Sequence, residues 1–296
     1  MVLSNLTKAI TVILFGILSF DLMSLIIKFF SDRYHILQIA VFRNFFGFIP
    51  PLLVVLFSKK IGKIFLHIGK RESALCFLRA LSICFAQVCF YSALAKIEFA
   101  IAITLAFVGP FFVTALSIPV LGLKVGRWRW GAILVGFLGV VWVMRPGISD
   151  FSISYLFPVG AAFGYAVSSI VVRLFPEKID SSIIQLHTQM YTLIISIILM
   201  YLLIETVPVT DFSDVWLFLA IGIFGGLGVL CLITCCRLVE PSQITPFEYF
   251  SIPISFFLGW YFFGEAPIEK LFPGVLVIVM SGLIIIWREN YQKNRV

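Results

Sequence analysis

The chain has 296 residues, of which 61% are hydrophobic and only 12% are charged, and its formal net charge is +7. Soluble domains average roughly 45–50% apolar and about 25% charged residues, so this composition excludes a soluble domain. The basic residues lie in short loops between apolar runs and form no continuous stripe, which excludes a nucleic-acid-binding surface.

Apolar segments long enough to cross a bilayer recur along the whole chain, since about 20 residues of α-helix span a hydrocarbon core of about 30 Å. The connections between them are short, so we expect an all-α integral membrane protein without an extramembrane domain. The six cysteines lie inside apolar runs without the spacing of a metal site, and we expect neither a metal nor a cofactor. The ten predicted helices cover residues 9–30, 36–57, 73–94, 98–120, 129–145, 153–174, 182–204, 214–236, 241–263 and 269–287.

The distribution of basic residues predicts the orientation. If both termini are cytoplasmic, the inner loops hold fifteen lysines and arginines and the outer loops hold four. Cytoplasmic loops of membrane proteins carry such an excess, and an odd number of spans or the opposite orientation would destroy it. We therefore expect a multi-pass protein with both termini in the cytoplasm.

The chain contains an internal repeat at an offset of 142 to 143 residues. The offset covers five spans, an odd number, so the second copy enters the membrane from the opposite side. This predicts two inverted five-helix repeats, 1–146 and 147–296, which are characteristic of secondary transporters. The alternative is that apolar helices simply resemble one another. The aligned pairs are Glu98 with Glu240, Pro110 with Pro253, Gly122 with Gly264, and Gly139 with Gly282.

Three stretches carry a family resemblance: "YSALAKIEFAIAITLAFVGPFFVTALSIPVLG", "CRLVEPSQITPFEYFSIPISFFLGWYFFGEAP" and "GVLVIVMSGLIIIWRE". With the ten spans, they resemble the EamA-type branch of the drug/metabolite transporter superfamily. That resemblance implies a bacterial inner-membrane carrier with a central cavity lined by spans one, three, four, six, eight and nine, and with spans five and ten at the periphery. One departure is Lys124, which stands where the family usually has the acid that Glu265 supplies in the second half.

Four shorter stretches narrow the resemblance within the branch. They are "FDLMSLIIK", "FRNFFGF", "FLRALSICFAQVCFYSAL" and "TPFEYF". These resemble bacterial S-adenosylmethionine uptake carriers and related metabolite carriers, so the resemblance implies an amino-acid-like or S-adenosylmethionine-like solute.

Five charged residues lie within predicted spans: Asp21, Lys28, Arg43, Arg79 and Glu248. A charge at the centre of a span costs about 2.5–3.5 kcal/mol, so these side chains must face protein, water or one another. We expect Asp21, Arg43, Arg79 and Glu248 to line a substrate site. The alternative is a set of structural ion pairs, and Lys28, near the end of its span, could also extend its amine to the interface.

Glu248 lies about seven residues into the ninth span, roughly 10 Å deep at 1.5 Å per residue. Prolines flank it, and proline removes a helical hydrogen bond and kinks a helix. Aromatic faces beside a carboxylate suit an organic cation or a stacked ring, although any single aromatic here is more often a packing residue. The expected aromatic site residues are Tyr249, Phe107, Phe111, Tyr91 and Tyr165, and the expected hinge or gating residues are Pro110, Pro246, Pro253, Gly225 and Gly226.

Three basic and two acidic groups within the spans favour a zwitterionic solute, with its carboxylate toward an arginine and its cationic group toward Glu248. The expected function is a secondary or facilitative transporter of small organic metabolites that works by alternating access. A proton-coupled exporter of amino acids or toxic compounds is the alternative, with Asp21 or Glu248 as proton carrier. An intramembrane enzyme is more remote, because the sequence has no nucleophile–base or metalloprotease pattern. We expect a monomer or homodimer in contact with lipid, and no nucleic acid as a partner.

Overall fold

The computed structural model describes residues 5–57, 68–122, 127–144, 152–176, 179–238 and 247–293, and all regular structure within them is helical. The helices are α1 (Asn5–Phe30), α2 (Ile36–Phe46), α3 (Ile49–Phe57), α4 (Lys70–Lys96), α5 (Phe99–Ala106), α6 (Gly109–Leu121), α7 (Arg127–Met144), η2 (Ile153–Tyr155), α8 (Leu156–Val172), α9 (Ser181–Leu203), α10 (Phe212–Leu238), α12 (Ser251–Phe263), α13 (Ile268–Leu271) and α14 (Gly274–Lys293).

Seven described segments are long and apolar enough to cross a bilayer, and they coincide with seven of the ten predicted spans. Helices α7, α12 and α14 lie at the positions of the other three. The outer surface is apolar: Leu138 and Trp142 of α7 are 64% and 54% exposed. An apolar surface of this kind suits lipid and not water. The seven segments are Thr7–Phe30, Ile36–Phe57, Lys70–Lys96, Phe99–Leu121, Ile153–Val172, Ser182–Leu203 and Phe212–Leu232.

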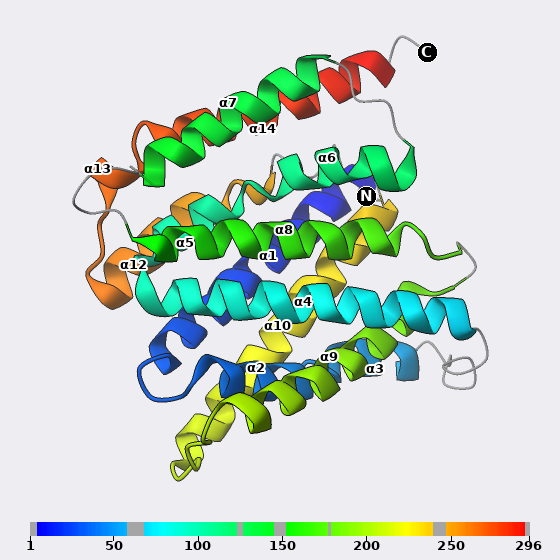
Figure 1. The fold of residues 1–296 in the computed structure, drawn as a ribbon, viewed down its shortest axis with the longest axis vertical. Helices are drawn as coiled ribbons and strands as arrows, with labels where there is room; N and C mark the ends of the chain where they lie inside the picture. Colours follow the sequence, from blue (N-terminus) through cyan, green and yellow to red (C-terminus); the bar gives the residue numbers. More distant parts are fainter. Residues whose placement is uncertain are drawn as a thin grey trace.

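The start of α1 and the end of α14 lie at the same end of the bundle, on the right in Figure 1. We call this end, where α1 begins and α14 ends, the terminal face, and the other end the opposite face. Helices α7 and α14 pair at one edge of the bundle (Figure 1). Their backbones approach so closely that a Cβ on Gly139 would lie 3.0 Å from the Gly274 carbonyl oxygen. This edge is where the resemblance places spans five and ten.

Two helices are interrupted near the middle of the bundle. The segment from α5 to α6 breaks at Phe107 and Val108, and the segment that leads into α12 breaks after Glu248, at a turn that contains Tyr249. Helices α6 and α12 then end at glycines with positive φ, Gly122 (68°) and Gly264 (66°). The two breaks stand 142 positions apart, as do the two glycines, so the repeat offset of the sequence recurs in backbone geometry.

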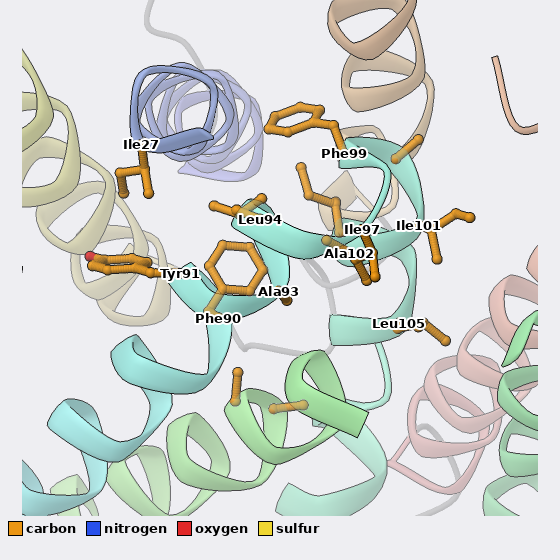
Figure 2. Close-up of a cluster of buried hydrophobic side chains, with 14 of the residues drawn as sticks. Ile27, Phe90, Tyr91, Ala93, Leu94, Ile97, Phe99, Ile101, Ala102 and Leu105 are labelled. Carbon is orange, nitrogen blue, oxygen red and sulfur yellow. The ribbon is translucent and has the colours of Figure 1, made fainter. Parts of the chain in front are cut away.

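Apolar packing differs between the two faces. The largest buried cluster gathers the opposite-face halves of α1, α4, α5, α8 and α10. Figure 2 shows part of it, with Ile27 of α1 near Tyr91 and Leu94 of α4, and Phe99 at the start of α5. Toward the terminal face, the described residues form two separate clusters, one around Cys76 of α4 and Ile183 of α9, the other around α1 and α10. Among the described residues, the core is therefore continuous at one face and divided at the other.

Glycine lets α10 lie directly on α2. A Cβ on Gly222 would come within 2.3 Å of Phe46 Cβ and 2.9 Å of Gly47 N, whereas a Cβ on Gly131 of α7 would meet no atom within 4 Å. We therefore expect Gly222→Ala to lower the free energy of unfolding by about 1–3 kcal/mol through overpacking. Gly131→Ala is the matched control and should be neutral or slightly stabilising, because alanine is the better helix former. Thermal unfolding in detergent compares the two variants, and equal melting temperatures would contradict this packing.

Candidate functional site

A network of uncharged polar side chains ties α2, α4 and α9 together in the middle of the bundle. Asn44, which is fully buried, donates hydrogen bonds from Nδ2 to Gln87 Oε1 (3.0 Å) and Ser196 Oγ (2.7 Å). Its Oδ1 accepts from Gln87 Nε2 at 3.0 Å, and its backbone oxygen accepts from Gln189 Nε2 at 2.8 Å. Hydrogen bonds between helices are a main source of association inside a membrane, so Asn44 fixes the position of α2.

Arg43 is held by this network but carries no counter-charge. Its Nη1 donates to Asn44 Oδ1 at 3.1 Å, its Nε has no partner, and no described carboxylate lies within ion-pair distance. A Cβ on Gly225 would lie 2.8 Å from Arg43 Nε, so the guanidinium packs closely against α10. Tyr91 and Tyr165 lie within electrostatic reach of the guanidinium. Asn44 thus orients the Arg43 guanidinium without using all of its N–H donors.

The two acidic residues lie where the broken helices meet α1. Asp21, 3% exposed, accepts a hydrogen bond from Ser251 Oγ at 2.6 Å, while its Oδ2 has no partner. Glu248 is partly buried and makes no hydrogen bond or ion pair with any described residue. The ring of Tyr249 lies 5.3 Å from that of Phe107, which brings the two helix breaks together. Two carboxylates and an aromatic pair therefore share one region.

Hydrogen-bonded neighbours give the level of each charge along the bundle. Met23 contacts the same point of α10 as Arg43, and Asp21 lies two residues, about 3 Å, away on α1. Gln87 bonds the residue next to Arg43, so it marks the Arg43 level on α4. Arg79 precedes Gln87 by eight residues, about 12 Å toward the terminal face. Asp21 and Arg43 hence share a central level with the helix breaks, and Arg79 lies apart from it.

Two other predicted site residues point elsewhere. Phe111 is fully buried against α7: its ring lies 6.0 Å from that of Phe137, and a Cβ on Gly136 would overlap it. Pro253 is exposed on α12. Phe111 therefore serves packing between α6 and α7 and does not face the central level.

The predicted hinge residues also lie in different parts of the bundle. Gly225 contacts Arg43, whereas Gly226 packs against Pro50 of α3. Pro110 lies in the first turn of α6, directly after the break, although its side chain is outside the described residues. Pro246 is wholly outside them.

Lys28 forms a structural ion pair, which was the alternative to a role in a substrate site. Its Nζ lies 2.8 Å from Glu265 Oε1 and donates to the Ile97 carbonyl oxygen at 2.8 Å. The other oxygen of Glu265 accepts from the backbone N–H of Phe99 at 2.7 Å. This ion pair joins α1, α5 and α12 at the opposite face, whereas Lys124, at the matching position of the first half, lies outside the described residues.

A search for charged residues within the spans does not find the polar network. Asn44, Gln87 and Gln189 are uncharged residues inside apolar runs, and they therefore carry no signal in a search for charges. The adjacency of Asn44 to Arg43 was the available signal, because a buried guanidinium needs an acceptor.

Comparison with known protein families gives two matches along the chain. Residues 7–145 and 152–287 both match the EamA-like transporter family. An S-adenosylmethionine uptake transporter of Rickettsia conorii is 27% identical over 95% of this chain and 93% of that protein. A pseudopaline exporter of Pseudomonas aeruginosa is 25% identical over 95% of this chain and 96% of that protein. A riboflavin transporter of Vibrio cholerae is 30% identical, but the match covers only 65% of this chain and 64% of that relative.

The fold itself also has a solved counterpart. A crystal structure that is 17% identical superposes with a TM-score of 0.65 over 94% of this chain and 96% of that chain.

Replacing Asn44 by leucine, a side chain of similar size, should strand the amides of Gln87 and Gln189 and the Arg43 guanidinium. Each buried group left without a partner costs about 1–3 kcal/mol, so Asn44→Leu should melt well below the wild type. The control is Thr11→Val, which loses only an exposed hydrogen bond to its own helix. If both variants unfold at the same temperature in detergent, the network does not hold the helices.

Proposed function

The chain belongs to the EamA-like transporter family, and on that premise we propose that it carries a zwitterionic, amino-acid-bearing metabolite by alternating access. The family and the similar proteins are transporters, so this multi-pass membrane protein is a transporter and not an enzyme. The proposal concerns the solute, the binding residues and the mechanism.

Two charges carry the proposal. The Arg43 guanidinium has a hydrogen bond to Asn44 but no described counter-charge, and the Glu248 carboxylate has no partner among the described residues. Each would be costly in a bundle that faced only hydrocarbon. A zwitterion satisfies both at once, because its carboxylate takes charge-assisted hydrogen bonds from Arg43 and its cationic group lies near Glu248. The Phe107–Tyr249 pair offers an aromatic face to the cation or to a ring.

S-adenosylmethionine has this chemistry: a carboxylate, an ammonium, a sulfonium and a purine ring. Relatives with that substrate in their names match this chain over nearly its whole length. An uncharged ring solute such as riboflavin would leave Arg43 and Glu248 without a group of opposite charge. We therefore favour S-adenosylmethionine or a solute of the same chemistry.

Alternating access rests on two similar halves, proposed as 1–146 and 147–296 in inverted orientation. The family match occurs once in each half, and the helix breaks and positive-φ glycines recur at one offset. Two mirrored units allow two states of similar energy that open to opposite sides. The continuous core at the opposite face and the divided core at the terminal face support a state closed at the former. We further propose that the terminal face is cytoplasmic, because its loops hold most basic residues.

Uptake of labelled S-adenosylmethionine into proteoliposomes tests the proposal. Arg43→Gln and Glu248→Gln should each reduce uptake at least tenfold, since each removes one of the two charges that bind the zwitterion, and excess riboflavin should not compete. The controls are Arg71→Gln and Glu205→Gln, which neutralise exposed residues at the membrane surface. Correctly folded Arg43 and Glu248 variants that transport like the controls would overturn the assignment of the site.

Energy coupling needs a separate arm of the same assay. An imposed pH gradient should alter the rate if Asp21 or Glu248 carries a proton. A rate that does not respond to the gradient, but rises when unlabelled solute is loaded on the far side, would instead establish exchange.

A further inference from the structure

We propose that Arg79 forms a second solute-binding site for the α-amino acid group, about 12 Å from the central level toward the terminal face. This inference rests on the proposed function: the solute occupies the Arg79 site on its way between the terminal face and Arg43. The Arg79 site is therefore a separate binding site on the transport path and not part of the central site.

Arg79 faces the interior of the bundle. It shares one face of α4 with Ala86 and Phe90, seven and eleven positions further on, and all three side chains are buried. The lipid-facing side of the same helix carries exposed Leu78 and Phe85. A cation nine-tenths buried on the inner face cannot extend to the lipid surface.

No described residue neutralises Arg79. Its Nε has no partner, and its guanidinium makes no hydrogen bond or ion pair within the described part of the chain. Lys28 shows the contrast, because that cation has both a carboxylate and a carbonyl partner. Leaving a guanidinium without a counter-charge inside a span is energetically unfavourable, and an anionic solute group would offset that cost.

Complementary groups lie beside Arg79 on α9. Thr188 neighbours Cys76, one turn before Arg79 on α4, and Gln185 lies one turn before Thr188. Both are buried, Gln185 Oε1 has no hydrogen-bond partner among the described residues, and the Thr188 hydroxyl lies beside the Cys76 thiol. Arg79 and the Thr188 hydroxyl can donate to a carboxylate, while the Gln185 carbonyl can accept from an ammonium. Together they match the two ends of an α-amino acid group.

Tyr165 connects this site to the central level. A Cβ on the preceding residue, Gly164, would lie 2.8 Å from the Ser82 carbonyl oxygen, so Tyr165 is level with a point on α4 between Arg79 and Gln87. Its side chain lies within electrostatic reach of Arg43. Tyr165 therefore lies between the two arginines along the bundle.

The test measures labelled S-adenosylmethionine flux in proteoliposomes of determined orientation, with solute presented at either face. For solute presented at the terminal face, Arg79→Gln should raise KM at least tenfold and change the maximal rate less than twofold. For solute presented at the opposite face, KM should stay within twofold of the wild type. Arg79→Lys keeps the charge and should restore most of the terminal-face KM, and Arg71→Gln is the control.

Two results would overturn the second site. One is an Arg79→Gln variant with unchanged KM at both faces. The other is equal loss of thermal stability in Arg79→Gln and Arg79→Lys without a sided change in KM, which would make Arg79 structural. If Arg43→Gln and Glu248→Gln abolish flux in the same assay while Arg79→Gln does not alter KM, only this inference fails and the proposed function stands.

Discussion

Inside a bilayer, each polar group must find its hydrogen bond within the protein or from what the protein carries, because water is absent. Many of the described polar groups in this bundle meet this requirement by pairing with one another. Lys28 pairs with Glu265 at the opposite face, and Asn44 exchanges hydrogen bonds with Gln87 in the middle. Against that background, Arg43 and Glu248 stand out as charges that the described protein leaves without a counter-charge, and the assignment of a solute site depends on this contrast.

The fold places these charges by interrupting its own helices. Where α5 gives way to α6, and where the chain turns into α12, backbone groups lose their helical partners and one aromatic ring of each turn packs inside the bundle. The Phe107–Tyr249 ring contact brings the two interruptions together next to Asp21 and Ser251. Glycine at 225 then admits Arg43 from the other side. The central level is thus a product of backbone irregularity that recurs in both halves.

Sequence reasoning predicted the helical membrane architecture, because twenty-residue apolar runs permit few alternatives. It also selected the charged residues as exceptional, since their cost in hydrocarbon is independent of the fold. It could not group them. Arg79 and Glu248 were expected in one site, but only interhelical partners such as Gln87 set their levels, and those partners follow from tertiary packing. Phe111 shows the same limit, because nothing in its local sequence reveals that Gly136 of α7 leaves room for its ring.

The most direct measurement is an experimental structure of the protein with S-adenosylmethionine or another transported zwitterion bound. The account predicts the solute carboxylate within hydrogen-bond distance of Arg43 and a cationic group of the solute within about 4–6 Å of Glu248, the range over which opposite charges stabilise one another. A structure in which the solute contacts neither residue, while Arg43 and Glu248 pair with protein groups, would contradict it.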